Sequence, residues 1–199
     1  MEEQILQFNE ERHEYSLGGT ILPSVTQIMQ PLSSAHYGKV DKDILQKSAE
    51  RGRIIHQAIQ FYIEFRAIDI PDEYLGCLNA FIKFEKDSKV EILSTEQKMY
   101  HPIYFYAGTL DILAKINGKI TLIDVKTYEK FSPHLERVQL HGYASIYEAN
   151  NDTKIDNKMI FIPYEDGSYK TAEYPAKDSE AKTIFESLYK VNRYIEKRS

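Results

Sequence analysis

The segment 119–127 constrains the fold of this chain most strongly. If it is a β-strand, Ile120 and Leu122 point to one face of the sheet, while Ile123 and Val125 point to the other. A strand that is apolar on both faces is typical of the middle of a sheet covered by helices on both sides. The segment therefore predicts a layered α/β fold with this strand in a central position.

Asp124 and Lys126 interrupt the apolar pattern at the end of this strand, and both continue the face of Ile120 and Leu122. Burying a charged side chain costs several kcal/mol unless the charge is paired or binds a metal. The pattern alone allows two interpretations. One is a structural Asp–Lys pair at the solvent end of the strand, and the other is a functional site.

The preceding strand carries another carboxylate, Asp111, in a segment that is otherwise apolar. The Asn-Gly pair at 117–118 is typical of a two-residue hairpin turn, and pairing that is symmetric about this turn places Asp111 opposite Asp124. Facing carboxylates repel each other, and a divalent cation with oxygen ligands, Mg²⁺ or Mn²⁺, removes the repulsion. Gly108 would let another group approach the backbone closely. The pattern favours a metal site with Lys126 beside it.

Elsewhere the chain alternates between helical and strand periodicity, which predicts a central mixed β-sheet flanked by helices. The Ser24–Gln27 pair is a capping box, so a short helix is expected to begin there and to stop before Pro31. The other expected helices are 43–66, 72–87, 133–150 and 177–197. The expected strands are short ones within 4–22, then 90–99, 103–116, 119–127, 157–164 and 168–174.

Composition limits the class of protein. The 199 residues carry a net charge of −5, which disfavours broad nonspecific coating of nucleic acid but allows a local basic groove. One cysteine, Cys77, excludes a disulfide framework, a zinc ribbon and a four-cysteine iron–sulfur cluster within the chain. No apolar run approaches a membrane span, and the acidic start lacks the features of a signal peptide. We expect a single cytoplasmic domain over 1–199.

Several motifs occur together in an order that resembles a known superfamily. Asp111, a spacing of thirteen residues, and then Asp124-Val125-Lys126 resemble the PD-(D/E)XK nucleases, and in particular their RecB-like and phage-type exonuclease branch, which includes the mitochondrial genome-maintenance exonucleases. The segment 50–56 resembles the helical Arg-Gly…His motif of that branch, and 139–143 resembles its Gln-x-x-x-Tyr motif. The resemblance implies a restriction-endonuclease-like core.

The resemblance also implies roles for individual residues. Asp111, Asp124 and the carbonyl of Val125 would bind the metal. Glu96 would join them directly or through water, and His56 would be a further metal ligand or a phosphate contact. The remaining catalytic residues would be Lys126, acting on the attacking water, with Gln139 and Tyr143. Apart from the resemblance, local clusters of basic residues that could follow a phosphate backbone indicate the DNA-binding residues Arg51, Arg53, Lys130 and Arg137. Structural alternatives stay open for each residue. Lys126 would then only neutralise the two aspartates, and His56 would be an ordinary structural histidine. Glu96 would be an exposed strand residue, Tyr143 a core residue and the basic residues solvent-exposed.

The resulting expectation is an Mg²⁺- or Mn²⁺-dependent DNA exonuclease without an iron–sulfur cluster, acting in recombination, repair or replication. Its partner would be single-stranded DNA or DNA with a free end, in a bacterial or phage-infected cell, with no membrane. A homo-oligomer or recombination and replication proteins as partners remain open. Two alternatives are kept: a catalytically inactive nucleic-acid- or protein-binding module on the same fold, and a structural protein whose charged cluster is only a salt-bridge network.

Overall fold

The computed structural model describes residues 5–38, 41–127 and 132–196. Its centre is a five-stranded mixed sheet in the order β4-β5-β6-β7-β8, and a separate three-stranded sheet has the order β1-β2-β3. The larger sheet consists of β4 (Glu91–Tyr100), β5 (Ala107–Ile116), β6 (Lys119–Val125), β7 (Asn157–Pro163) and β8 (Tyr169–Pro175). The smaller one consists of β1 (Leu6–Asn9), β2 (Glu14–Leu17) and β3 (Thr20–Leu22).

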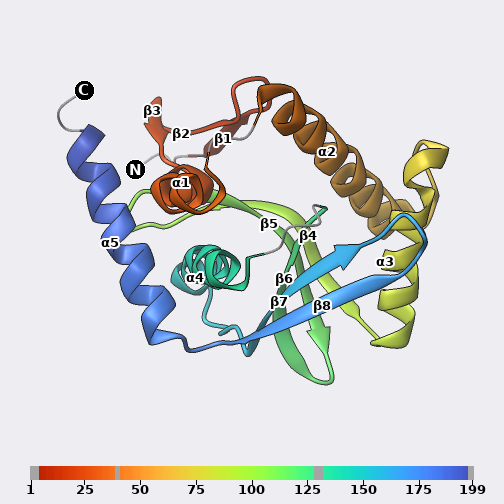
Figure 1. Ribbon diagram of the computed structural model, residues 1–199. Helices are drawn as coiled ribbons and strands as arrows, with labels where there is room; N and C mark the ends of the chain where they lie inside the picture. The colour runs from red at the N-terminus through yellow and green to blue at the C-terminus, as the bar shows by residue number, and fades with distance from the viewer. Residues whose placement is uncertain (1–4, 39–40, 128–131, 197–199) are drawn as a thin grey trace.

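Helices cover both faces of the larger sheet (Figure 1). One face packs against α1 (Val25–Tyr37), α4 (Pro133–Asn150) and α5 (Ser179–Glu196); the other packs against α2 (Lys42–Phe65) and α3 (Leu75–Asp87), which follows the short 3-10 helix η1 (Asp72–Tyr74). The predicted fold class, α/β with a central mixed sheet flanked by helices, is confirmed.

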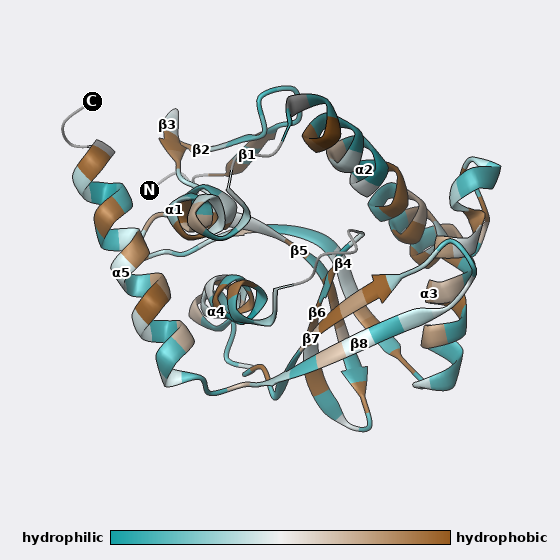
Figure 2. Cartoon of the chain, viewed as in Figure 1, coloured by the Kyte–Doolittle hydropathy of each residue, from teal (hydrophilic) through white to brown (hydrophobic). Residues whose placement is uncertain are grey.

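The central position predicted for the 119–127 strand is also confirmed. β6 pairs antiparallel with β5 and parallel with β7, and α4 makes the connection between the two parallel strands. Leu122 joins the apolar cluster under α4, whereas Ile123 and Val125 join the cluster under α2 and α3. Its neighbour β7 is hydrophobic over most of its length (Figure 2). Both faces of β6 are therefore buried, as its two apolar faces require.

The first helix is longer than the sequence predicted. Its capping box is present: the Ser24 hydroxyl accepts the Gln27 N–H, and the Gln27 side chain accepts the Ser24 N–H. The helix nevertheless continues past Pro31 to Tyr37. Proline removes one backbone hydrogen bond, but Pro31 is exposed, while Ile28 is buried in the core. Packing of the inner face thus overrides the break expected at Pro31.

One further boundary differs from expectation. The strand predicted from residue 103 begins at Ala107, because the His101 ring nitrogen accepts the N–H groups of Ile103 and Tyr104 and folds this segment into a turn. At the start of α2, the apolar residues Ile44 and Leu45 are 59% and 60% exposed. Across the described ranges, none of the helices has the length and apolarity needed to cross a membrane.

Candidate active site

Three carboxylates form a row across the middle of the sheet. The β5–β6 pairing of Ile112 with Ile123, continued by one residue, sets Asp111 opposite Asp124, as the hairpin symmetry predicted. In the β4–β5 ladder, the pairs Thr95–Ile112 and Gln97–Leu110 lie on either side of Glu96 and set it opposite Asp111. Three adjacent strands therefore each contribute one acid to a single row.

The backbone around this row departs from regular strand geometry. Glu96 has a φ of 47°, in the left-handed region that non-glycine residues rarely adopt. The Asp111 carboxylate accepts the backbone N–H of Val125 at 2.7 Å. Such strained positions persist where the surrounding structure fixes them, and they are concentrated at functional sites.

His56 reaches this row from α2. Its Nδ1 lies 3.3 Å from a Glu96 carboxylate oxygen and 3.7 Å from Asp111 Oδ2, and its Nε2 lies 3.1 Å from the carbonyl oxygen of Val125. One ligand atom from each of His56, Glu96 and Asp111 lies within 4.8 Å of the others. Three of the five predicted metal ligands therefore form a candidate metal site, and the Val125 carbonyl contacts one of them.

The electrostatics of this site show that the carboxylates are crowded. Burial raises the pKa of Asp111 to about 7; the charge of His56 opposes this shift, while Asp124 and Glu96 add to it. Burial alone would lower the pKa of His56, but Asp111 and Glu96 together raise it to about 9. The acids thus favour added positive charge, so the donor set fits a divalent cation.

Contacts around Gly52 position His56. A β-carbon at Gly52 would lie 3.3 Å from the Thr127 hydroxyl, so glycine allows α2 to approach the end of β6 closely. Arg51 donates to the Thr127 carbonyl at 2.7 Å and pairs with Glu165. This predicted DNA-binding arginine therefore braces α2 against the sheet, five residues before His56.

Lys126 lies on the α4 side of the row. Its Nζ is 2.8 Å from Asp124 Oδ2, donates to Gln139 Oε1 at 3.0 Å, and lies 3.6 Å from Glu136 Oε2. The Gln139 amide in turn donates to the Tyr143 hydroxyl at 3.1 Å. The predicted catalytic residues on β6 and α4 therefore form one continuous chain of polar contacts, in which Lys126 neutralises buried carboxylates.

Tyr143 is buried. A β-carbon at Gly108 would lie 2.8 Å from its ring, so the close approach predicted at Gly108 is that of the Tyr143 side chain. Burial raises the pKa of the Tyr143 hydroxyl. With its ring packed on β5, Tyr143 acts as a core residue whose hydroxyl positions Gln139.

Glu136 was not found by reading the sequence. It is almost fully buried in the first turn of α4, and it lies three and seven residues before Gln139 and Tyr143. That spacing places the three side chains on one face of a helix, so a search for polar residues on the face of the Gln-x-x-x-Tyr motif would have found it. Tyr15 was also missed; its hydroxyl contacts the Thr109 hydroxyl at 2.7 Å, two residues before Asp111.

The remaining predicted DNA-binding residues do not gather at the row. Arg53 is exposed on α2 and pairs with Glu50 and Gln57. Arg137 is paired with Asp178 and Glu180 at the start of α5. Lys130 lies outside the described residues.

The Arg137–Asp178 pair leads to a prediction about stability. The Asp178 side chain is 4% exposed, and two hydrogen bonds from Arg137 lower its pKa to about 2. Because the folded pKa lies below the unfolded value, the pair stabilises the fold above pH 3.8, and this contribution, about 2 kcal/mol, is lost as the pH falls through 2. Asp178→Asn should therefore lose about 2 kcal/mol at pH 7 and flatten the acid limb of denaturant-unfolding curves.

Glu180→Gln is the matched control, because Glu180 also pairs with Arg137 but is 67% exposed. An exposed ion pair is worth between about 0 and 1 kcal/mol. Equal losses of stability in the two variants would contradict the assignment of the buried pair.

Comparison with known proteins finds distant nuclease relatives. No protein-family model matches the chain. It is 26% identical over 176 residues to mitochondrial genome maintenance exonuclease 1 of Xenopus tropicalis, covering 75% of this chain and 50% of that protein. The Mus musculus protein of the same name is 25% identical over 204 residues, with coverages of 89% and 60%. The chain thus spans half to three-fifths of the length of these curated relatives.

Among solved structures, the crystal structure of LHK-Exo in complex with dAMP has a TM-score of 0.47 and 12% sequence identity, and the match covers 84% of each chain.

Proposed function

We propose that this chain is a divalent-metal-dependent deoxyribonuclease, an exonuclease of the RecB-like branch of the PD-(D/E)XK superfamily, with residues 1–199 as one domain. The observation that carries the proposal is the row of Glu96, Asp111 and Asp124 across three strands, with Lys126 two residues after the last acid. DNA as the substrate is supported by the names of the distant relatives, which are genome maintenance exonucleases.

In this proposal His56, Glu96, Asp111, Asp124 and the carbonyl of Val125 hold the metal. The donors are mostly oxygen atoms with one imidazole, a set that suits Mg²⁺ or Mn²⁺ and lacks the thiolate ligands of cysteine-based zinc sites and iron–sulfur clusters. A cation bound there supplies polarisation of a phosphate oxygen and a lowered pKa for bound water.

The contacts of Lys126 support its proposed catalytic role. Asp124, Glu136 and Gln139 surround Nζ, so the ammonium is fixed in place beside the row of acids. A fixed cation can orient a water molecule and stabilise negative charge that develops on a phosphate. Gln139 touches Lys126 directly, while Tyr143 acts on Lys126 through Gln139.

An exposed arginine on α2 indicates where the DNA would lie. Among the predicted DNA-binding residues, Arg53 is exposed on α2, three residues before His56, and is available to a phosphate backbone once its exposed partner Glu50 is displaced. Arg51 and Arg137 serve mainly as structural braces in this proposal. The substrate would be single-stranded DNA or DNA with a free end, in recombination, repair or replication.

The test is a cleavage assay on end-labelled single- and double-stranded DNA with Mg²⁺ or Mn²⁺, and with EDTA. The proposal expects cation-dependent shortening of the label-bearing strand, and the product lengths report the direction and the mode of attack. DNA binding that EDTA does not affect, with no cleavage of any substrate, would overturn the proposal in favour of an inactive binding module.

A further inference from the structure

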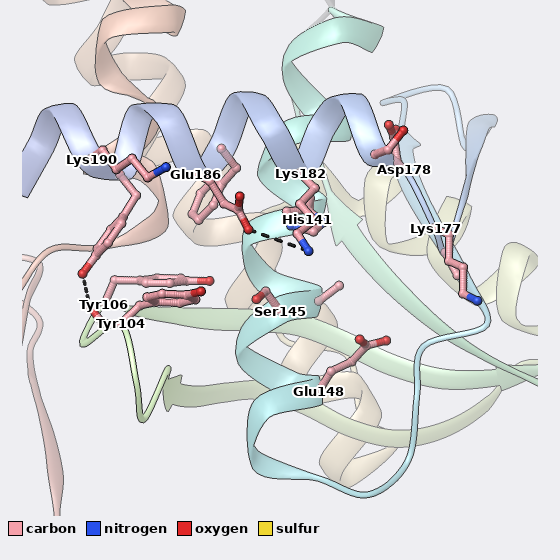
Figure 3. A pocket seen from close by; sticks show the side chains of 15 residues that line it. Tyr104, Tyr106, His141, Ser145, Glu148, Lys177, Asp178, Lys182, Glu186 and Lys190 are labelled. Atoms are coloured by element: carbon pink, nitrogen blue, oxygen red, sulfur yellow. Dashed lines mark hydrogen bonds and ion pairs between the residues drawn. The ribbon is translucent and has the colours of Figure 1, made fainter.

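The structure contains a cavity away from the row of acids. It has a volume of about 600 Å³ and lies between α4, α5 and the turn that ends at Tyr106 (Figure 3). On α4, His141 is two residues from Gln139, a rotation of about 200° around the helix axis. The cavity therefore opens on the side of α4 opposite to the side that contacts Lys126, and its volume lies within the range of small-molecule sites.

Basic groups gather in the middle of this cavity. Figure 3 shows His141 and Lys182 close to each other, from α4 and α5. Burial, together with the charges of Lys158 and Lys182, lowers the pKa of His141 to about 4. Mutual repulsion of this kind is relieved by an anion placed among the basic groups.

Lys158 does not line the cavity, but its buried positive charge acts on His141, which does. It lies on β7, its side chain is 0% exposed, and among the described residues its Nζ makes no hydrogen bond. Its charge acts on His141, and it is itself influenced by Asp178 and Glu148, both of which line the cavity. Burial lowers the pKa of Lys158, as expected for a buried ammonium without a close partner.

The acids that line the cavity are engaged elsewhere or are exposed. The Glu148 carboxylate accepts the backbone N–H of Ile155 at 3.1 Å. Asp178 is committed to Arg137 through two hydrogen bonds. Glu186 lies 3.9 Å from Lys182, and both side chains are exposed, so this ion pair is weak and easily replaced by a stronger anion.

Aromatic side chains form one end of the cavity. Tyr104 and Tyr189 lie with ring centroids 5.6 Å apart, and the Tyr189 ring lies 5.9 Å from the buried ring of Tyr106. The Tyr189 hydroxyl donates to the Tyr104 carbonyl at 2.6 Å, which fixes the two elements relative to each other. Rings that are partly exposed in this way can stack on a nucleobase.

We propose that this cavity binds a nucleoside 5′-monophosphate unit, with the phosphate between His141 and Lys182 and the base against Tyr104 and Tyr189. The phosphate supplies a negative charge between the basic side chains of His141 and Lys182. The base stacks on the tyrosine rings at the aromatic end of the cavity. The unit is either a free mononucleotide or the 5′-phosphorylated end of a strand. This site goes beyond the proposed cleavage reaction and uses none of its residues.

The test is calorimetric titration of the full chain with dGMP in EDTA, with deoxyguanosine and inorganic phosphate as partial ligands. Wild type should bind dGMP more tightly than either part. Lys182→Ala and Tyr104→Ala should each weaken dGMP binding by about tenfold or more. Lys83→Ala, an exposed lysine on α3, is the control and should bind as wild type does. Unchanged affinity in Lys182→Ala, or no binding of dGMP by wild type, would overturn the proposal.

A local readout guards against misfolded variants. In wild type, dGMP should shift the imidazole resonances of His141, assigned with His141→Asn, and should raise the pKa of that ring. A nucleotide that shifts His56 but not His141 would place binding at the row of acids and would overturn the proposal.

Further titrations separate the occupants and the two sites. Displacement of dGMP by a 5′-phosphorylated oligonucleotide, but not by its unphosphorylated form, would identify the strand end as the occupant; dGMP binding without displacement would identify the free nucleotide. Asp124→Asn should keep its affinity for dGMP while losing cleavage. Binding without cleavage in wild type contradicts only the proposed nuclease, and cleavage without dGMP binding contradicts only this second site.

Discussion

Asp124→Asn is expected to lower the rate of DNA cleavage by about 10³-fold while the fold persists. Stabilisation of transition-state charge by a bound metal is worth several kcal/mol, and losing about 4 kcal/mol corresponds to this factor. The fold should survive because asparagine keeps an acceptor for Lys126, which also retains Gln139 at 3.0 Å and Glu136 at 3.6 Å. Rates from end-labelled DNA, together with circular dichroism and melting curves, provide the measurement.

Asp69→Asn is the matched control, since Asp69 is exposed in the loop after α2. This variant should cleave DNA as wild type does. Lys126→Ala is a poorer probe. It would leave Asp124 and Glu136, with side chains 6% and 2% exposed, without this shared cation, which costs roughly 3–5 kcal/mol of stability. Undiminished cleavage by a folded Asp124→Asn protein would contradict the catalytic assignment.

Asp111→Asn is expected to lower the rate of DNA cleavage by the same factor as Asp124→Asn. It is also expected to raise the melting temperature of the metal-free protein. Burial, with Asp124 and Glu96 nearby, raises the pKa of Asp111 to about 7, above its value in the unfolded chain. Ionised Asp111 therefore destabilises the metal-free fold, and this cost grows as the pH rises from about 4 through 7. Asparagine removes the charge and can still accept the N–H of Val125.

The measurement is thermal unfolding of wild type and Asp111→Asn in chelator, at pH 5 and pH 8. The variant should gain about 2 kcal/mol at pH 8, or roughly 4–8 °C, and less at pH 5. A lower melting temperature than wild type at pH 8 would show that the carboxylates do not repel one another in the folded protein.

The sequence was sufficient to predict the convergence of Asp111 and Asp124, because a two-residue turn at 117–118 leaves one symmetric register for its strands. It was not sufficient to place Glu96 opposite Asp111. β4 has a register irregularity between Ile92 and Ser94, and Glu96 itself has a left-handed φ, neither of which periodicity can reveal.

Contacts between helices and the sheet were the hardest to predict. His56 and Gly52 were singled out by resemblance, but their contacts with Val125 and Thr127 depend on how α2 packs on β6. Arg137 was assigned to DNA on its charge alone, whereas its partner Asp178 lies far along the chain and becomes adjacent only when α5 packs beside α4. A charge pattern therefore identifies charged positions along the sequence, but it does not identify the partner of each charged side chain in the fold.

The most direct test of the account is calorimetric titration of Mn²⁺ into wild type, Asp111→Asn and Asp69→Asn, without DNA. If the acids of β4, β5 and β6 share a divalent cation, wild type and Asp69→Asn bind Mn²⁺, and Asp111→Asn binds it at least about tenfold more weakly. Absence of Mn²⁺ binding to wild type, or equal affinity in Asp111→Asn, would contradict the account.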